Sequence, residues 1–501
     1  MIEYEALEVW FVTGSQHLYG PETLERVRAN TARVVEGLNA VGHVPIRVVA
    51  KPTLTTAEEV TRTLTDASST PACIGVIAWM HTFSPAKMWI AGLERLNKPL
   101  CHLHTQSERD IPWPVIDMAY MNLHQSAHGD REFGHICERL GLRRKVIAGH
   151  WQSPDPQRKL GTWMRAAAAW HASQNLKVAR FGDNMRGVAV TEGDKVAAQR
   201  VFGYAVEGFG IGELAGRVDA VSDGEAADLC AVYEHEYDLA EGLRSGAPER
   251  RSLVEAARIE LGLRSFLREG GFSAFTDTFE DLAGLKQLPG IAAQRLMADG
   301  YGFGAEGDWK HAALVYQMKV MARGLPGGTS FMEDYTYHLD PEAPAVLGAH
   351  MLEICPSIAS ATPSCQVHPL DIGSREDPVR LVFDGAEGPA VNATVVDLGD
   401  RFRMVVNRVN AIEPPEDLPR LPVARVLWRP EPDLTTSAEA WIYAGGAHHT
   451  GFSHALTAEH LRDFASIAGV EFLDIADGTT VPGFCNELRW NQAAFASTPR
   501  L

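Results

Sequence analysis

Four segments in the last two-fifths of the chain combine carboxylates and imidazoles with glycines and aromatic side chains. They supply Glu306, Glu333, His350 and the adjacent pair His448 and His449. Two carboxylates and two imidazoles form a mixed oxygen and nitrogen set. Such a set suits six-coordinate ions such as Mn²⁺, Co²⁺ or Mg²⁺ and leaves positions for water and substrate. The residue types therefore predict a divalent-metal site without thiolate ligands.

Each segment by itself also has a simpler explanation. Glu306 fits a cap at the start of a helix, and Glu333 fits a solvated strand end. His350 fits a hydrogen-bonded structural histidine, and the pair His448 and His449 fits a surface loop. Two glycines precede that pair and allow close backbone approach, and adjacent imidazoles are costly to bury without partners. The prediction of a metal site rests on the four segments together.

The candidate ligands lie far apart along the chain. Glu306 precedes Glu333 by 27 residues, Glu333 precedes His350 by 17, and His350 precedes His449 by 99. These separations exclude a motif carried by a single helix, in which two histidines one turn apart hold the metal. The fold has to bring the ligands together.

The first third of the chain predicts a parallel sheet. Short apolar runs alternate there with amphipathic segments, which is the pattern of β-α-β units. Ligands bind at the carboxyl ends of such strands, where this chain carries Gln16, Tyr19 and the residues 80–83. The expected strands are 8–13, 43–50, 73–79, 100–104 and 145–150.

The rest of the chain predicts two further domains. A helix at about 155–175 precedes a strand at 177–181, and glycines and a proline at 324–328 interrupt the chain after a series of helices. Beyond residue 365, alternating strands indicate an antiparallel or barrel-like domain. We therefore expect an α/β protein with a three-domain protomer: an N-terminal α/β domain (1–175), a central α/β domain (176–328) and a β-rich C-terminal domain (329–501). The expected helices are 247–269, 290–299, 308–323, 458–468 and 482–495, and the expected late strands are 379–383, 393–397 and 402–406.

Composition and charge exclude several classes of protein. Hydrophobic residues make up 45% of the 501 residues and charged residues 22%, as in ordinary globular proteins, and the net charge is −18. The acidic balance disfavours binding to nucleic acid or to an anionic membrane. Seven dispersed cysteines without a CxxC pair and an acidic N-terminus without an apolar run predict a cytoplasmic protein.

Long local patterns of this chain resemble those of the L-arabinose isomerase family over nearly the full length. Chance matching of so many ordered segments is negligible. The segments that carry the resemblance are 11–24, 121–133, 285–290, 306–309, 328–335 and 444–450.

The resemblance implies a homohexamer whose protomers each hold a Mn²⁺ site, with Co²⁺ or Mg²⁺ as possible substitutes. It assigns the metal to Glu306, Glu333, His350 and His449, and leaves His448 as a substrate contact. It also implies that His128 reaches the active site of a neighbouring subunit. The substrate-binding residues carried over are Gln16, Leu18, Tyr19, Phe83, His128, Met185, Phe279, Phe331, Tyr335 and His448.

The reaction that the resemblance implies is the interconversion of L-arabinose and L-ribulose. A metal-stabilised cis-enediol forms when a base removes a carbon-bound proton and an acid serves the oxygens. Glu306 and Glu333 are the acid and base, and which of them removes the proton stays open. Alternatives are an L-fucose isomerase, a metal-dependent sugar epimerase or aldolase, and a sugar-binding module without turnover.

Overall fold

The computed structural model describes residues 2–370 and 375–496, and these form two units. One unit holds residues 2–171 together with 462–469. The other holds residues 172–461 and the segment from 470 onward. Residues 1, 371–374 and 497–501, which the predicted domains include, lie outside the described residues.

The N-terminal unit contains a parallel five-stranded sheet in the order β2-β1-β3-β4-β5. The strand β3 is buried along its whole length, as expected for a strand that helices cover on both faces. The carboxyl ends of β1 and β3 therefore meet at one edge of the sheet. The strands are β1 (Glu8–Gly14), β2 (Arg47–Ala50), β3 (Cys73–Met80), β4 (Leu100–His104) and β5 (Lys145–Ala148).

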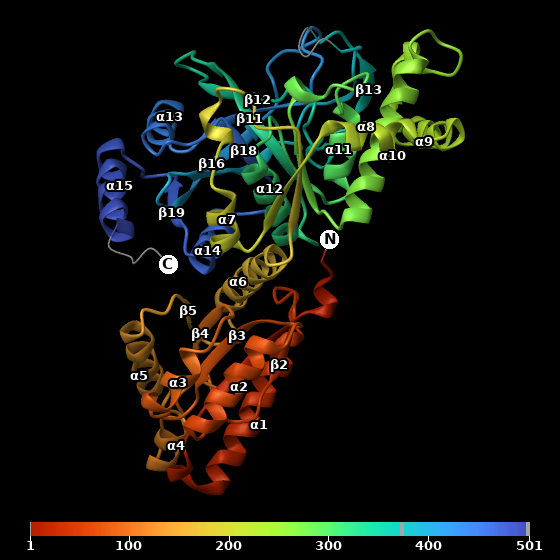
Figure 1. Cartoon of the computed structure of the whole chain (residues 1–501). Helices are drawn as coiled ribbons and strands as arrows, with labels where there is room; N and C mark the ends of the chain where they lie inside the picture. The colour runs from red at the N-terminus through yellow and green to blue at the C-terminus, as the bar shows by residue number, and fades with distance from the viewer. Residues whose placement is uncertain (1, 371–374, 497–501) are drawn as a thin grey trace. The chain divides into compact units, whose positions relative to one another are not determined.

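Helices flank this sheet (Figure 1). Thr56 and Glu59 form a reciprocal capping box that fixes the start of the second helix. The segment 462–469 also belongs to this unit, where Lys145 Nζ lies 2.7 Å from an oxygen of Asp463. The helices are α1 (Gly20–Asn39), α2 (Ala57–Ser69), α3 (Ile90–Leu93), α4 (Met118–Leu123), α5 (Ser126–Arg139) and α6 (Pro154–Ser173), whose last turn reaches the unit boundary.

The second unit begins with a parallel four-stranded sheet in the order β10-β9-β6-β7. Its strands are β6 (Lys177–Phe181), β7 (Ala205–Phe209), β9 (Ala274–Asp277) and β10 (Gly302–Gly304). Phenylalanine side chains from these strands and from neighbouring helices make up much of the core beside it. The helices are α7 (Lys195–Phe202), α8 (Ile211–Asp219), α9 (Asp223–Glu236), α10 (Arg250–Gly270), α11 (Gly290–Ala298) and α12 (Trp309–Ala322).

The β-rich part of this unit is a closed ring of six strands in the order β15-β18-β11-β12-β17-β16, because β15 also pairs with β16. All pairings within the ring are antiparallel. A seventh strand, β19 (Glu471–Ile475), adds to β16 in parallel. The ring strands are β11 (Thr329–His338), β12 (Ala345–Ala349), β15 (Gly388–Asp397), β16 (Phe402–Ile412), β17 (Arg425–Pro430) and β18 (His449–Ser453).

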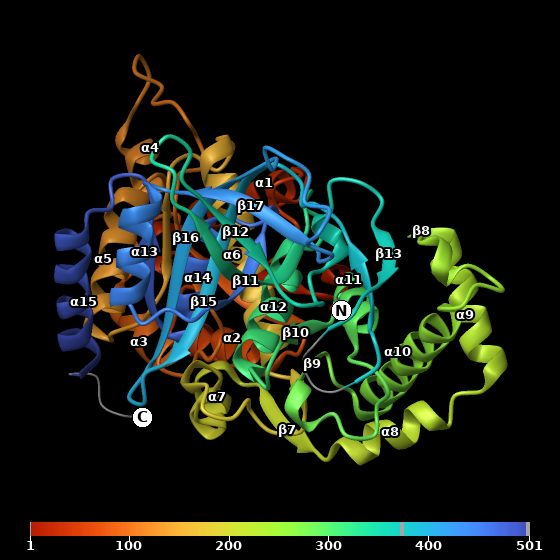
Figure 2. The same cartoon turned by 90° about the horizontal axis from the view of Figure 1, so that it is seen from above.

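The helix α12 connects the parallel sheet to the ring. Its residues are buried on every side, including Lys310, His311, Gln317 and Lys319, as expected for a helix that runs through a core and has its polar groups hydrogen bonded. It contacts β9 and β10 of the sheet as well as β11, β15 and β18 of the ring, and Figure 2 shows it beside β10 and β11. A short sheet of β8 (Asp238–Leu239), β13 (Ser364–Val367) and β14 (Val379–Val382) and the helices α13 (Leu434–Tyr443), α14 (Ala458–Ala468) and α15 (Val481–Ala496) complete the described chain.

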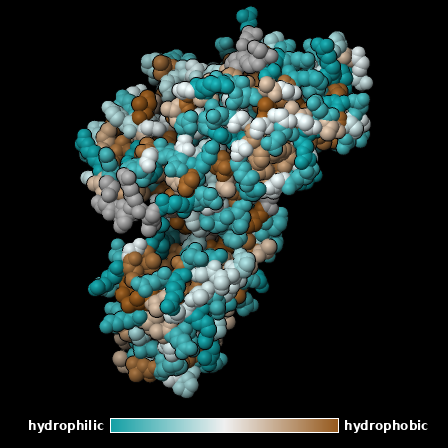
Figure 3. Space-filling view, viewed as in Figure 1, coloured by the Kyte–Doolittle hydropathy of each residue, from teal (hydrophilic) through white to brown (hydrophobic). Residues whose placement is uncertain are grey.

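The face seen in Figure 3 is mainly hydrophilic, with separate apolar patches. Several large apolar side chains are exposed in the segment 111–121 that precedes and includes α4, among them Trp113 at 76%. Across the described residues, no helix combines the length and the apolar character needed to cross a membrane.

The expected fold class is confirmed: two parallel-sheet α/β domains precede a β-rich domain with a barrel-like ring. The predicted helix at 155–175 is α6, and the predicted strand at 177–181 is β6. The expected helices in the later parts of the chain are also present with small shifts at their ends, whereas the strands predicted at 393–397 and 402–406 were too short: β15 spans Gly388–Asp397 and β16 spans Phe402–Ile412. The domain boundaries near 175 and 328 stay predictions.

Candidate active site

Glu306 follows directly on the carboxyl end of the parallel sheet, two residues after β10 ends at Gly304. Its φ is 61°, and it is the one non-glycine residue of the described chain with a positive φ. The left-handed conformation costs an L-residue roughly 1–2 kcal/mol, and such strain is concentrated at functional sites. The side chain is only about one-fifth exposed, so this conformation directs a carboxylate into the interior.

The register of the ring brings the other three predicted ligands beside each other. Glu333 on β11 pairs with His449 on β18 and, on its other side, with Ala349 on β12. His350 is the next residue after Ala349. Three neighbouring strands therefore present one carboxylate and two imidazoles at one edge of the ring.

The distances between these side chains fit a shared cation. His449 Nε2 lies 3.7 Å from Glu306 Oε2, and His350 Nε2 lies 4.0 Å from Glu333 Oε2. Glu306, His350 and His449 each offer a ligand atom within 4.8 Å of the other two. Donors that bind one cation at about 2.1 Å are separated by up to about 4.2 Å. The structure thus brings Glu306, His350 and His449 into one group and places Glu333 beside His350; that these four residues bind metal stays a prediction.

Carboxylates outside this set orient both imidazoles. His449 Nδ1 lies 3.1 Å from Asp308 Oδ2, and His350 Nδ1 lies 2.5 Å from Glu353 Oε2. Because Nδ1 of His449 then carries the hydrogen, its Nε2 has a free lone pair toward the site, and the contact with Glu353 turns Nε2 of His350 toward Glu333. His449 Nε2 is buried and has no hydrogen-bond partner within the described chain. A buried acceptor of this kind fits a metal ligand, so the donor set suits a divalent cation.

The two histidines differ in charge. Burial lowers the pKa of His449 to about 4, although Asp308 opposes this. Burial also disfavours a charge on His350, but the attraction of Glu353 outweighs it and raises the pKa of His350 to about 9. A cation that binds here has to replace the proton on His350.

The pKa values of the two glutamates are shifted in opposite directions. Burial raises the pKa of Glu333, against the attraction of His350. Burial acts in the same sense on Glu306, but the interactions with His448 and His449 outweigh it and lower the pKa of Glu306. Two carboxylates whose pKa values are separated in this way can divide the roles of acid and base.

A cavity of about 310 Å³ opens beside the four ligands, and Glu306, Glu333 and His350 form part of its wall. Met185, Phe279 and Tyr335, which were predicted to contact substrate, also line it. The volume lies within the range of small-molecule sites. Phe331 does not line the cavity: its side chain is fully buried, and its ring centroid lies 5.2 Å from that of His350 and 5.0 Å from that of His449.

Known proteins resemble this chain along its whole length. Models of the N-terminal, central and C-terminal domains of L-arabinose isomerase match residues 3–175, 177–324 and 328–471. The L-arabinose isomerase of Koribacter versatilis (strain Ellin345) is 62% identical over 498 residues, which cover 99% of each chain. The L-arabinose isomerase of Geobacillus stearothermophilus is 59% identical over 492 residues, which cover 98% of this chain and 99% of that protein.

The chain belongs to the L-arabinose isomerase family. The resemblance seen in its sequence motifs is thereby confirmed, and the chain is an isomerase. The motifs that contain Glu306, Glu333 and His449 lie within the matched central and C-terminal domains.

Of the remaining predicted residues of this L-arabinose isomerase family member, His448 lies beside the site, with its Nε2 3.9 Å from Glu306 Oε2. The others lie in the N-terminal unit, near the carboxyl ends of β1 and β3. Gln16 Nε2 donates to the carbonyl oxygen of Phe83 at 3.0 Å. The rings of Phe83 and His128 lie 4.6 Å apart. Tyr19 is hydrogen bonded to Gln125, and the side chain of Leu18 is 82% exposed. Most of these residues thus form one cluster within their own unit.

Two residues that position the ligands were not identified from the sequence of this L-arabinose isomerase family member. Asp308 lies two residues after Glu306, within the quoted segment 306–309, and Glu353 lies three residues after His350. A carboxylate three residues after a histidine is a pattern visible in the sequence, and it could have identified Glu353 as a partner of His350. Asp308 has the same spacing to His311, whose Nδ1 lies 2.6 Å from Asp308 Oδ2, but its contact with His449, 141 residues away, had no local signal.

Proposed function

We propose that this chain converts L-arabinose to L-ribulose by moving a proton between C1 and C2 through an enediol. The observation that carries the proposal is the pair Glu306 and Glu333, whose pKa values are shifted in opposite directions, beside His350 and beside His449, whose buried Nε2 has no hydrogen-bond partner within the described chain. The cavity next to them has room for a monosaccharide. The relatives that share over half of this sequence carry the name L-arabinose isomerase, which supports arabinose as substrate.

Glu306, Glu333, His350 and His449 would hold one divalent cation, Mn²⁺ in the first place, with Co²⁺ or Mg²⁺ as substitutes. A bound cation of this kind supplies Lewis-acid polarisation of the substrate carbonyl and the adjacent hydroxyl. Asp308 and Glu353 hold the two imidazoles so that each Nε2 faces the site.

The glutamates divide the proton transfers. The lowered pKa of Glu306 favours the ionised form that accepts the carbon-bound proton. Glu333, whose pKa burial raises, would then be the group that serves the sugar oxygens. Met185, Phe279 and Tyr335 line the cavity around the sugar and exclude water from the reacting carbons.

The test is an assay of ketose formation from a panel of aldoses with Mn²⁺ present. We expect L-arabinose to be turned over with the highest kcat/KM, ahead of L-fucose, D-galactose and D-xylose. Treatment with a chelator should remove the activity, and Mn²⁺ should restore it. Higher kcat/KM with L-fucose would favour a fucose isomerase. Binding of the sugars without turnover would favour a binding module, and epimer or cleavage products would favour an epimerase or aldolase.

We further propose that the active protein is a homohexamer in the cytoplasm. The cluster of Gln16, Phe83 and His128 gives a set of polar and aromatic groups that would bind sugar in the site of a neighbouring subunit. The seven cysteines are all free, which suits a reducing compartment. Neither nucleic acid nor membrane is a partner in this proposal.

A further inference from the structure

The direction of the Glu306 side chain depends on an unusual turn of the backbone. Glu306 and Gly307 both have positive φ, 61° and 79°. Glycine adopts this conformation freely, whereas glutamate does so only when its surroundings enforce it. Relaxation of Glu306 to a negative φ would turn its carboxylate away from the position in which it lies 3.7 Å from His449.

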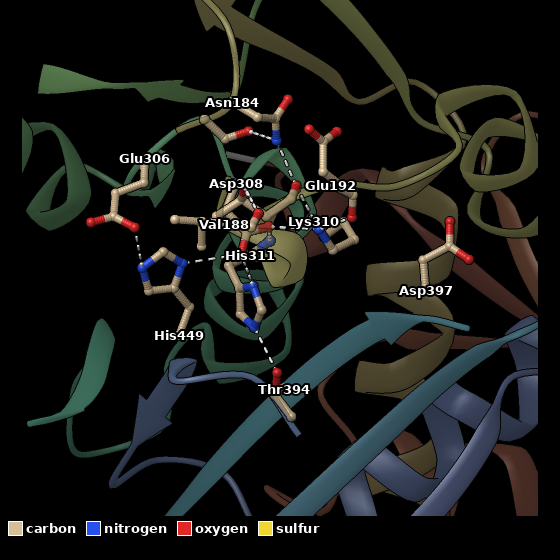
Figure 4. Close-up of polar contacts among 12 residues, drawn as sticks. Asn184, Val188, Glu192, Glu306, Asp308, Lys310, His311, Thr394, Asp397 and His449 are labelled. Carbon is tan, nitrogen blue, oxygen red and sulfur yellow. Dashed lines mark hydrogen bonds and ion pairs between the residues drawn. The ribbon is translucent and has the colours of Figure 1, made fainter. Parts of the chain in front are cut away.

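Three hydrogen bonds from other segments enforce this turn. The backbone N–H of Met185 donates to the Glu306 carbonyl at 3.0 Å, and the N–H of Gly307 donates to the Asp277 carbonyl at 2.9 Å. The third bond comes from a side chain: Asn184 Nδ2 donates to the Gly307 carbonyl at 3.1 Å. Figure 4 shows this amide above the segment that carries Glu306 and Asp308.

The amide of Asn184 has one defined orientation. Arg180 Nη1, which can only donate, lies 2.6 Å from Asn184 Oδ1. The opposite end of the amide, Nδ2, therefore faces the carbonyl oxygens of Gly307 and Thr191, the latter at 2.6 Å. The side chain of Asn184 is buried, with 6% exposed. The segments are in close contact, because a Cβ on Gly307 would lie 2.5 Å from the Cα of Asn184.

We propose that Asn184 is a positioning residue that holds Glu306 in its left-handed conformation and so fixes the carboxylate at the metal site. Asn184 does not line the cavity, so it acts through the backbone of Gly307 and Glu306. This role rests on the proposed function, in which Glu306 is a ligand and an acid/base group. Asn184 lies in the loop that follows β6. From this loop it would determine metal affinity and turnover.

Loss of the Asn184 amide should leave the surrounding loop in place. Lys310, itself buried, donates from Nζ to the carbonyls of Thr191 at 2.9 Å and Glu192 at 2.8 Å. Lys310 belongs to α12, so hydrogen bonds from this helix also hold the loop (Figure 4). By contrast, the side-chain hydrogen bond to the Gly307 carbonyl comes from Asn184. A substitution of Asn184 therefore acts chiefly on the turn at Glu306.

The experiment compares two variants of Asn184 with a matched control. Asn184→Asp keeps the shape and the contact with Arg180 but turns an oxygen toward two carbonyls, and Asn184→Ala removes the amide without adding charge. Asn407→Ala is the control, because Asn407 is also 6% exposed, donates from Nδ2 to the carbonyls of Glu431 and Ile475, and does not line the cavity at the four predicted ligands. For each protein, Mn²⁺ is titrated into metal-free enzyme by calorimetry, and kcat/KM is measured with L-arabinose.

We expect both Asn184 variants to raise the Kd for Mn²⁺ and to lower kcat/KM, each by about tenfold or more, as is usual when a residue that orients a ligand is lost. The Asn407 variant should keep the wild-type Kd. A wild-type Kd and kcat/KM in either folded Asn184 variant would overturn the inference, as would equal losses in the control. Failure of both Asn184 variants to fold, while Asn407→Ala folds, would show a structural role instead. A wild-type protein that neither binds Mn²⁺ nor isomerises the sugar would refute the proposed function itself.

Discussion

Glu333 lies directly opposite His449 in the antiparallel pairing of β11 with β18. Residues that pair in this way have Cβ atoms about 4.5–5.5 Å apart on the same face of the sheet. The register of two strands that are far apart in sequence therefore decides that a carboxylate and an imidazole share the site. A shift of β18 by one residue would turn His449 to the face of the sheet opposite Glu333.

Loss of any one ligand should abolish activity while the protein stays folded. We expect Glu306→Ala, Glu333→Ala, His350→Ala and His449→Ala each to lower kcat with L-arabinose by at least about 100-fold, because the cation and its charge stabilisation are lost. Circular dichroism and the oligomer size should match the wild type. Tyr337→Phe, on the outer part of β11, is the control that keeps activity. Wild-type turnover in any two ligand variants would refute the site.

His448 should matter less than His449. The side chain of His449 is fully buried, while 38% of the His448 side chain is exposed, and His448 Nε2 lies 3.9 Å from Glu306 Oε2. We expect His448→Ala to raise KM for the sugar and to leave Mn²⁺ affinity near the wild-type value. A larger loss of Mn²⁺ affinity in His448→Ala than in His449→Ala would show that His448 is the ligand.

The proton that moves between C1 and C2 should exchange with solvent. During turnover of L-ribulose in D₂O, we expect deuterium at C2 of the L-arabinose formed, because a carboxylate holds the proton during the reaction and a carboxylic acid exchanges with water. Nuclear magnetic resonance of the product measures it. Complete absence of deuterium in the product would instead indicate a direct hydride shift.

Mixed oligomers test whether His128 acts in a neighbouring subunit. His128→Ala and Glu306→Ala protomers should each be inactive, and activity should return when the two are mixed and exchange subunits. Some sites would then combine an intact Glu306 with an intact His128. Mixed hexamers verified by mass spectrometry but without recovered activity would mean that His128 serves its own chain.

The N-terminal unit should lose part of its stability at alkaline pH. His104 Nδ1 lies 2.7 Å from Asp130 Oδ2, and this hydrogen bond raises the pKa of His104 above the usual value against the effect of burial. A raised pKa contributes stability that is complete below the usual histidine value of about 6.5 and is lost as pH rises through the raised value. Urea unfolding measures the free energy of unfolding of the wild type and of Asp130→Asn. The difference between these two free energies should therefore shrink between pH 6 and pH 9. A difference in free energy of unfolding that stays constant over this pH range would contradict the stabilisation of protonated His104 by Asp130.

Much of the fold was predictable because its signals are local. The apolar run 73–79 predicted the fully buried strand β3, and the alternating segments after residue 365 predicted the β-rich domain. The types and neighbours of Glu306, Glu333 and His350 indicated a metal site, since each lies in a motif that can be recognised without knowledge of its surroundings.

The tertiary structure alone decided how these residues work. His449 rather than His448 is the fully buried imidazole because β18 begins at His449 and pairs it with Glu333. Asp308 and Asn184 reach the site through hydrogen bonds to residues 141 and 123 positions away. Sequence patterns report the periodicity and chemistry of one segment, whereas strand register, the left-handed turn at Glu306 and such long-range bonds arise only when distant segments pack against each other.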